Sequence, residues 1–323
     1  MPRVSVIIPT YNRVDVLPRA IDSVRKQTME DFELIVVDDG STDDTQSYLQ
    51  SLDDPRIRTV AHGTNQGANV ARNTGIEAAE GTYVGFLDSD DEWKRTKLDR
   101  QLALLEERPD EWVAVYCDAE LHVGGAAGRI EMVGARFLAR TRPSHKMEGG
   151  EELMGEILAD NVQPGAGSTL LVRTDVARRI GGFDESLDRF QDPEFVLRIL
   201  EEGKVGYVDE PLVIRHETGS PDPHVVESAD EQYLAAYADR IESLEAAGFD
   251  VRASHNLVLA KAHLANGNFR DGGRYLVDAS TTPRYYPGVV WAAGAGVRRR
   301  PRAAIAVGIL MLIGFLTWVA AAS

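Results

Sequence analysis

Cysteine and lysine are scarce in this chain of 323 residues, and it has no surplus of basic side chains. The lone Cys117 excludes an internal disulfide and gives no sign of an oxidising compartment. The formal net charge of −16 argues against binding to the nucleic-acid backbone, which requires clustered Lys and Arg, so we expect no nucleic-acid partner. Only six of the 35 basic residues are lysine. An acidic, lysine-poor surface favours solubility in high salt, as in a haloarchaeal protein, although drift in a GC-rich genome explains the same composition.

Long apolar runs are absent until the end of the chain. Residues 1–3 lead directly into a short strand pattern, so we expect no signal peptide. Residues 303–322 carry no charge and reach the length of about 20 residues that crosses a bilayer. Arginines at 298, 299, 300 and 302 precede them, and basic flanks favour the cytoplasmic side. We predict a single-pass C-terminal membrane anchor with the large N-terminal part of the chain in the cytoplasm. A buried core helix is the alternative, and whether the segment spans or only docks on the membrane stays open.

Short buried strands alternate with helical patterns through the first part of the chain. Strand patterns occupy residues 4–8, 33–37, 56–61 and 82–87. Strands that alternate with helices predict an α/β fold with a parallel, doubly wound sheet. From about residue 225 to 284 the pattern is helical. We therefore divide the chain into a domain at 1–222, a helical region at 223–297, and the basic flank with the anchor at 298–323.

Polar residues follow several of these strands. Thr10 and Tyr11 follow the first, Asp38 and Asp39 the second, and residues 88–91 (Asp-Ser-Asp-Asp) the fourth. Ligands of such sheets bind beyond the carboxyl ends of the strands, so we expect these groups to share one crevice. Three carboxylates within four positions repel one another unless a cation compensates them. A divalent ion is one explanation and a solvated turn is the other.

Four motifs carry a resemblance to a known family: residues 4–13 (VSVIIPTYNR), 36–43 (VVDDGSTD), 71–75 (ARNTG) and 86–91 (FLDSDD). In this order and spacing they resemble the family 2 glycosyltransferases with the GT-A fold. The resemblance covers about residues 3–217. It implies a mostly parallel sheet flanked by helices, and an enzyme that transfers a sugar from a nucleotide diphosphate donor.

The resemblance also implies residues that bind the donor. Thr10 and Tyr11 would lie against the nucleotide, and the Asp39 carboxylate would accept hydrogen bonds from the base or ribose. Arg72 would reach the diphosphate with its guanidinium fork, and Asp88 would contact the ribose and diphosphate. The alternatives are that Asp39 only caps a turn and that Arg72 only forms a surface ion pair.

The expected cofactor is Mg²⁺ or Mn²⁺, held by Asp88 and Asp90, with His216 completing its shell. The catalytic base implied by the resemblance is Asp192, with Gln191 beside it on the acceptor side, where the family more often has Glu. Asp192 also suits a helix cap ahead of a proline, and a lone histidine such as His216 is often structural.

We therefore predict an inverting, metal-dependent glycosyltransferase that uses a UDP, GDP or dTDP sugar and a hydroxyl of a glycan or lipid-linked acceptor. The Gln-x-x-Arg-Trp motif of processive relatives is absent, which indicates that one sugar is added per acceptor. The alternatives are a non-catalytic sugar-nucleotide-binding protein and a nucleotidyltransferase of related fold. The second would need a Gly- and Lys/Arg-rich phosphate loop after the first strand, and residues 9–13 (PTYNR) do not resemble one.

Overall fold

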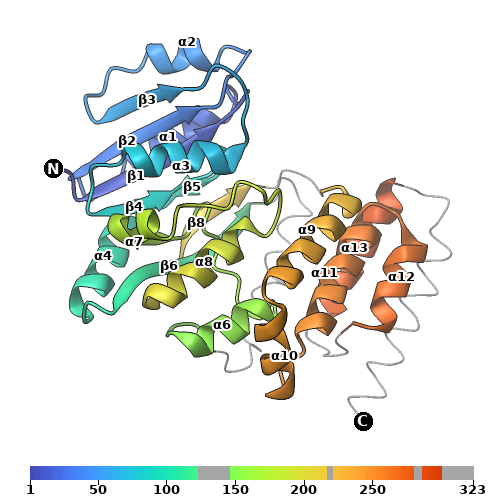
Figure 1. The fold of residues 1–323 in the computed structure, drawn as a ribbon. Coiled ribbons are helices and arrows are strands. Elements are labelled where there is room, and N and C mark those ends of the chain that lie inside the picture. The colour runs from blue at the N-terminus through green and yellow to red at the C-terminus, as the bar shows by residue number, and fades with distance from the viewer. Residues whose placement is uncertain (123–145, 217–220, 280–285, 300–323) are drawn as a thin grey trace. The chain divides into compact units, whose positions relative to one another are not determined.

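The structure is a computed structural model that describes residues 1–122, 146–216, 221–279 and 286–299 (Figure 1). The chain forms two compact units. The first unit contains residues 1–157 and 162–217, and the second contains residues 158–161 and 218–323.

Among its described residues, the first unit forms one eight-stranded sheet in the order β3-β2-β1-β4-β7-β6-β8-β5. The strands are β1 (Val4–Thr10), β2 (Phe32–Asp38), β3 (Ile57–Ala61), β4 (Tyr83–Phe86), β5 (Glu92–Trp93), β6 (Trp112–His122), β7 (Leu171–Arg173) and β8 (Lys204–His216). Strands β3, β2, β1 and β4 are parallel, and β6 and β8 run the same way. Only β7 and β5 run against them. The predicted α/β fold with a mostly parallel sheet is confirmed.

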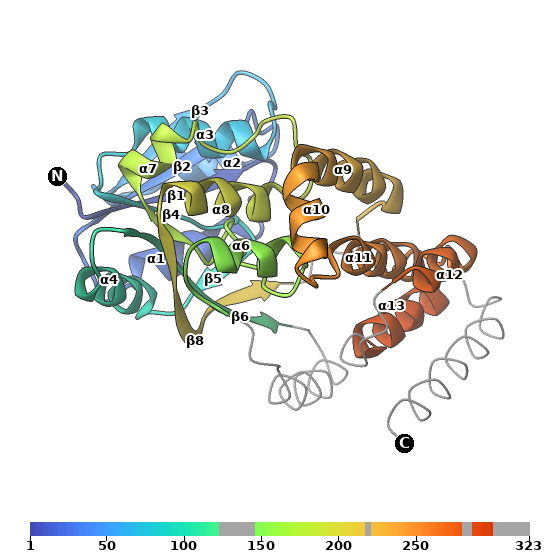
Figure 2. The same cartoon turned by 60° about the horizontal axis from the view of Figure 1, so that its bottom comes forward.

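Helices flank this sheet on both faces (Figures 1 and 2). They are α1 (Leu17–Arg25), α2 (Thr45–Gln50), α3 (Ala68–Ala78), α4 (Lys97–Glu107), α6 (Glu151–Leu158), α7 (Thr174–Arg179) and α8 (Gln191–Glu202). Successive side chains of a strand point to opposite faces, so a strand covered on both faces is apolar throughout. This is why β1 and β2 appear in the sequence as largely apolar runs, interrupted only at Ser5 and Glu33 before their polar C-terminal ends.

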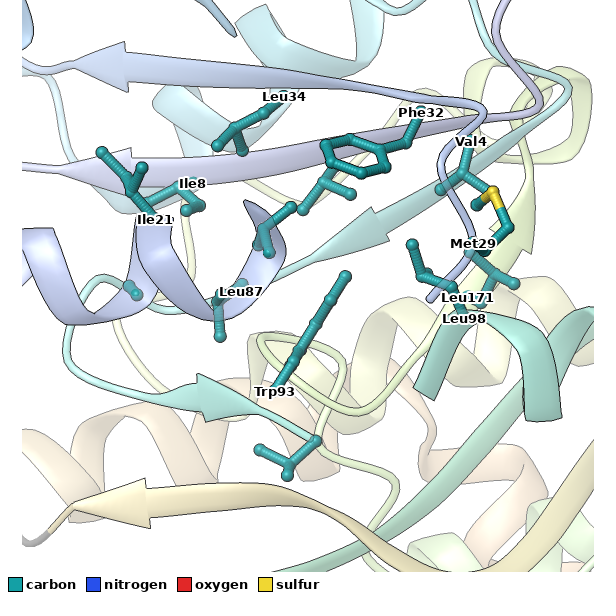
Figure 3. Close-up of a cluster of buried hydrophobic side chains, with 14 of the residues drawn as sticks. Val4, Ile8, Ile21, Met29, Phe32, Leu34, Leu87, Trp93, Leu98 and Leu171 are labelled. Carbon is teal, nitrogen blue, oxygen red and sulfur yellow. The ribbon is translucent and has the colours of Figure 1, made fainter. Parts of the chain in front are cut away.

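A core cluster of buried hydrophobic side chains, larger than the one formed by Ile35, Val37, Ala71 and Ala79, lies between the sheet and helices α1 and α4 (Figure 3). Val6 and Ile8 of β1 belong to this cluster together with Ile21 of α1. Ile7, which points to the opposite face, meets helix α3 at Gly75. A Cβ atom at Gly75 would lie 2.4 Å from Cγ2 of Ile7, so this glycine allows α3 to lie directly against the sheet.

A two-residue strand that the sequence pattern does not reveal fixes the acidic segment. Strand β5 pairs with β8, with Trp93 opposite Val213. Residues 88–91 therefore connect β4, in the middle of the sheet, to β5 at its edge. The Trp93 indole is 3% exposed, packs in the larger core, and donates a hydrogen bond to the backbone oxygen of Ser168 at 2.8 Å. Both ends of the segment are thus anchored in the sheet.

The described residues of the second unit are helical. Its helices are α9 (Pro223–Ala236), α10 (Ala238–Ala246), α11 (Val251–Ala265), α12 (Phe269–Val277) and α13 (Tyr286–Arg299). The buried His255 of α11 hydrogen bonds to Asp230 of α9 at 2.5 Å and to the backbone oxygen of Leu158 at 3.0 Å. Burial lowers the pKa of His255, but the hydrogen bond and charge of Asp230 outweigh it, so the pKa is raised overall.

The predicted anchor at residues 303–322 lies outside the described residues. Within the described ranges, no helix combines the length and apolar character needed to cross a bilayer.

Candidate active site

The acidic segment separates into side chains that face the strand ends and one that is buried. Asp88 accepts a hydrogen bond on Oδ1 from Nη2 of Arg72 at 2.7 Å. The Asp90 carboxylate lies 3.8 Å from Nη1 of Arg13, and the Asp90 backbone oxygen accepts from Nη2 of Arg19 at 2.5 Å. With Arg215, whose Nε lies 3.9 Å from Oδ2 of Asp91, four arginines from other parts of the chain surround this turn and offset the repulsion between its carboxylates.

Asp91 points into the protein and orders the turn. Its side chain is 5% exposed and accepts hydrogen bonds from Oγ of Ser168 at 2.7 Å and from the backbone N–H of His216 at 3.2 Å. Burial raises the pKa of Asp91 to about 6. These bonds join the acidic segment to the end of β8.

Arg72 reaches the site from the buried face of α3. Its Nη1 donates to Oδ1 of Asn69 at 3.0 Å, and its guanidinium carbon lies 5.2 Å from the centre of the Phe183 ring. Burial lowers the pKa of Arg72, but the charges of Asp88 and Asp192 outweigh this effect and raise it. Its buried Nε makes no hydrogen bond within the described residues. Arg72 is thus a fixed positive charge that retains an unused donor.

Asp192 lies in the first turn of α8, directly after Gln191, which is half-buried. Its Oδ2 accepts a hydrogen bond from the backbone N–H of Gly167 at 3.2 Å, whereas its buried Oδ1 has no partner in the described part of the chain. Burial raises the pKa of Asp192, and the charge of Asp88 raises it further, although Arg72 opposes the shift. A carboxylate with a free oxygen and a raised pKa suits a general base.

The nucleotide end of the predicted site lies where β1 and β2 finish. Thr10 and Asp38 are neighbours in the register of these strands, and both are buried. Oγ1 of Thr10 and Oδ2 of Asp38 have no hydrogen-bond partner among the described residues. Tyr11, the next residue along the chain, is 41% exposed. This strand end therefore offers two unused acceptor atoms beside an accessible aromatic ring.

Asp39, predicted to bind the base or ribose, is already hydrogen bonded within the protein. Its Oδ1 receives Nδ1 of His62 at 2.7 Å, and its oxygens accept the backbone N–H groups of Gln66 and Gly67 at 2.8 to 3.0 Å. Each oxygen already accepts two hydrogen bonds, which is about the capacity of a carboxylate oxygen. Asp39 thus holds the loop before α3, and the unused acceptors at this strand end belong to Thr10 and Asp38.

The residues predicted to bind metal do not form a preassembled cage. His216 lies next to Glu92, with Nε2 2.8 Å from Oε1, and its ring is 5.0 Å from that of His122. Within the described ranges, no cluster of three or more His, Cys, Asp or Glu side chains has the arrangement of a metal site. Mg²⁺ usually binds through a few carboxylates together with substrate phosphates, and Asp88 and Asp90 supply hard oxygen donors of this kind. The Asp88 and Asp90 carboxylates therefore fit a divalent cation whose remaining ligands a diphosphate would supply.

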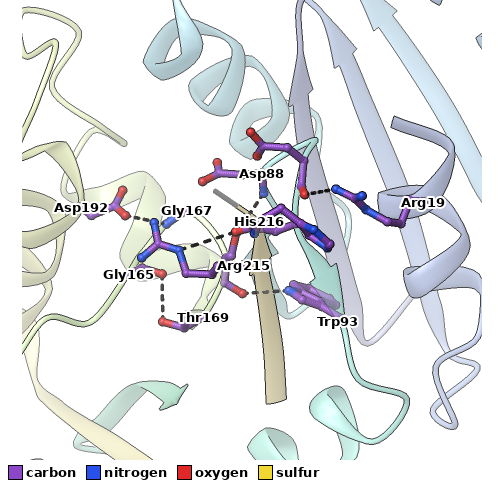
Figure 4. A network of polar contacts seen from close by, with 12 residues as sticks. Arg19, Asp88, Trp93, Gly165, Gly167, Thr169, Asp192, Arg215 and His216 are labelled. Atoms are coloured by element: carbon purple, nitrogen blue, oxygen red, sulfur yellow. Dashed lines mark hydrogen bonds and ion pairs between the residues drawn. The ribbon is translucent and has the colours of Figure 1, made fainter. Parts of the chain in front are cut away.

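Four contributors to this site are not singled out by the sequence motifs: Arg13, Arg19, Gly167 and Ser168. The arginines are distant in sequence from Asp90, whose carboxylate Arg13 approaches and whose backbone oxygen Arg19 contacts. Gly167 and Ser168 act through a backbone N–H and a hydroxyl. Arg13 lies inside the first motif, so its place in the TYNR run was the one available signal. Figure 4 shows Arg19, Asp88, Gly167 and Asp192 gathered around this site.

Residues 5–180 match the description "Glycosyl transferase family 2", which is more than half of the chain. The chain belongs to glycosyltransferase family 2 and is an enzyme of this class. The predicted membership is confirmed.

Curated relatives agree with this assignment. An uncharacterized glycosyltransferase of Haemophilus influenzae is 28% identical over 281 residues, covering 85% of this chain and 88% of the relative. The GalNAc(5)-diNAcBac-PP-undecaprenol beta-1,3-glucosyltransferase of Campylobacter jejuni is 47% identical over 95 residues, 28% of this chain and 31% of the relative. An Escherichia coli UDP-Glc:alpha-D-GlcNAc-diphosphoundecaprenol beta-1,3-glucosyltransferase, WfaP, is 40% identical over 106 residues, 33% of this chain and 42% of the relative. The matches to these last two span less than half of each relative.

Solved structures support the GT-A fold. The mannosyltransferase PcManGT from Pyrobaculum calidifontis, solved with GDP-Man and Mn²⁺, has a TM-score of 0.57 at 18% identity, covering 98% of this chain and 87% of that one. The S. aureus protein TarS in complex with UDP-GlcNAc has a TM-score of 0.54 at 18% identity, covering 93% and 92%. At this level of identity the similarity concerns the fold alone.

Proposed function

We propose that this glycosyltransferase moves one sugar from a nucleotide diphosphate donor to a hydroxyl of a lipid-linked or surface glycan, with inversion and with the help of Mg²⁺ or Mn²⁺. The proposal rests on Asp192, whose buried Oδ1 has no hydrogen-bond partner within the described residues. Burial and the charge of Asp88, which is itself paired with Arg72, raise the pKa of this carboxyl. A base and a fixed positive charge in one place suit an attack by a hydroxyl on a diphosphate-linked carbon.

In the proposed reaction, Oδ1 of Asp192 takes the proton from the acceptor hydroxyl while that oxygen bonds to the anomeric carbon. The bond from this carbon to the diphosphate oxygen breaks, and the nucleoside diphosphate leaves. Arg72 stabilises the charge that develops on the leaving diphosphate through its guanidinium, including the unused Nε–H. One displacement with one base inverts the anomeric centre.

A divalent cation held by Asp88 and Asp90 would supply further charge neutralisation at the diphosphate. The Asp88 and Asp90 carboxylates are the hard donors in this arrangement, with His216 beside them on β8. PcManGT, which was solved in complex with Mn²⁺, supports a divalent ion as cofactor. Among the protein side chains, Arg72 would position the donor diphosphate directly.

For the nucleotide, we propose that Thr10 and Tyr11 line the base and ribose, and that Asp39 shapes their pocket by fixing the loop at Gln66. The free Oδ2 of Asp38 supplies the acceptor that Asp39 no longer offers. Solved structures of the same fold hold UDP-GlcNAc or GDP-Man, so uracil and guanine donors are both tested below, with thymine donors.

For the acceptor, two relatives with diphosphoundecaprenol in their names support a lipid-linked glycan. We propose that Gln191 contacts this acceptor beside Asp192, that residues 1–222 form the catalytic domain, and that residues 223–297 and the anchor at 298–323 hold it at the membrane. No comparison favours the nucleotidyltransferase or the non-catalytic alternative.

The test measures nucleoside diphosphate released by purified protein from UDP-, GDP- and dTDP-sugars, with Mn²⁺ and a polyprenyl-diphosphate glycan extract. We expect release with one donor class, abolished by EDTA and restored by Mn²⁺. Failure to release a nucleoside diphosphate from any donor, with the wild-type chain folded, would contradict the proposal.

A further inference from the structure

A short turn between α6 and β7 contacts both the acidic segment at residues 88–91 and the proposed base Asp192. Two buried side chains hydrogen bond to the backbone of residues 165–169 (Gly-Ala-Gly-Ser-Thr). The Trp93 indole donates to the Ser168 backbone oxygen at 2.8 Å, and Nε2 of the fully buried Gln101 donates to the Thr169 backbone oxygen at 2.8 Å. These bonds come from β5 and α4, so the turn has a fixed position relative to the sheet.

Ser168 bridges two members of the acidic segment. Its buried Oγ accepts the backbone N–H of Asp88 at 3.1 Å and donates its only proton to Oδ2 of Asp91 at 2.7 Å. One hydroxyl therefore fixes the backbone at Asp88 and orients the carboxylate of Asp91. Figure 4 shows Asp88 beside Gly167 and Thr169 of this turn.

Gly167 lies between the Asp88 carboxylate and the proposed base, Asp192. Its backbone N–H donates to Oδ2 of Asp192, which leaves Oδ1 as the free oxygen. On its other side, a Cβ atom at this position would lie 2.7 Å from Oδ2 of Asp88. Its φ angle is outside the left-handed region, so the need for glycine here is steric and does not come from the backbone conformation.

We propose that Gly167 and Ser168 are positioning residues that hold the Asp88 carboxylate and the Asp192 base at a fixed separation, so that the donor diphosphate and the acceptor hydroxyl meet in line. This inference rests on the proposed roles of Asp88 and Asp192. It adds that the size of residue 167 sets the distance between the two carboxylates.

The turn offers a matched control. Gly165 is two residues away in the same turn, and a Cβ atom there would meet only Thr169 and Arg215, at 3.8 Å or more. Gly167→Ala and Gly165→Ala are therefore the same substitution in the same segment, and only the first displaces Asp88.

The experiment compares the two variants with wild type in three measurements: kcat and KM for the active donor, half-saturating Mn²⁺ by electron paramagnetic resonance in the presence of UDP or GDP, and the thermal midpoint. We expect Gly167→Ala to lower kcat/KM about 10- to 100-fold, as a misplacement of about 1 Å can, and to weaken Mn²⁺ binding. Gly165→Ala should stay within about twofold, as conservative changes away from contacts do. A merely structural role would lower the midpoint and the active fraction and leave KM and Mn²⁺ binding unchanged.

Equal values for the two alanine variants would overturn the inference. Should Gly167→Ala fail to fold, Ser168→Ala takes its place: weakened Mn²⁺ binding, with recovery in Ser168→Cys, supports the inference, and wild-type behaviour overturns it. If wild type binds Mn²⁺ but transfers no sugar, the proposed function fails, and the binding data alone then decide the positioning role.

Discussion

Replacing Asp192 with Asn removes the proposed base with little change in shape. The amide oxygen can keep the hydrogen bond from the Gly167 N–H, which measures 3.2 Å to the carboxylate. The other oxygen, Oδ1, has no hydrogen-bond partner within the described residues, so changing it to NH₂ breaks no bond within them. The variant therefore isolates proton transfer from the packing around α8.

The expected loss can be estimated from the role of one base. A positioned general base contributes about 10²- to 10⁴-fold to rate. At about 1.4 kcal/mol per tenfold, this corresponds to about 3 to 5 kcal/mol of transition-state stabilisation. The free energy of unfolding, in contrast to the rate, should stay the same or rise in Asp192→Asn. Because the pKa of Asp192 is raised, its ionised form costs free energy in the folded state at neutral pH, and Asn removes this cost.

The assay measures kcat at saturating donor from pH 5 to 8, donor affinity by calorimetry, and the thermal midpoint. We expect Asp192→Asn to lose about 10²-fold or more in kcat, to bind donor as wild type does, and to unfold at the same or a higher temperature. The rising limb of the wild-type pH profile, set by a carboxyl above its usual pKa of about 4, should disappear. Asp188→Asn, the same change at an exposed position near α8, is the control. A kcat for Asp192→Asn within about threefold of wild type would refute the base assignment.

Three further predictions concern other parts of the molecule. Asp90→Ala should raise the Mn²⁺ concentration needed for half-maximal rate about tenfold or more and leave metal-free nucleotide affinity unchanged; an unaltered Mn²⁺ titration would count against this ligand. Gly75→Ala, whose Cβ would lie 2.4 Å from Cγ2 of Ile7, should destabilise by about 1–3 kcal/mol in urea unfolding, whereas Gly63→Ala, with nothing within 4 Å, should not; equal midpoints would argue against the close approach of α3. The pKa of His255 is raised despite burial, so its contribution to stability is complete below the unfolded pKa of about 6.5 and is lost as pH rises through the folded pKa. The midpoint of wild type should therefore fall more steeply than that of His255→Asn above this pH, and parallel curves would exclude the effect.

The sequence alone predicts much of the sheet because its central strands are buried on both faces. Largely apolar runs such as residues 4–8 and 33–37 leave little ambiguity. Strand β5 escapes prediction because two residues carry no periodicity, and its pairing with β8 depends on residues more than a hundred positions away. Its consequence is large, since β5 anchors the end of the acidic segment.

The candidate site is predicted in part for a similar reason. Motifs identify carboxylates and arginines at strand ends, where the fold brings Arg72 to Asp88. They do not reveal how many hydrogen bonds a side chain already makes. Asp39 is saturated by His62 and by backbone groups of the following loop, and only three-dimensional structure places these donors around it.

The most direct test of the account is the mass of the acceptor after incubation with each nucleotide sugar and Mn²⁺. We predict that one donor adds the mass of a single sugar to a polyprenyl-diphosphate glycan, that EDTA prevents the addition, and that Asp192→Asn suppresses it. An unchanged acceptor mass with every donor, or a ladder of many added sugars, would contradict the account.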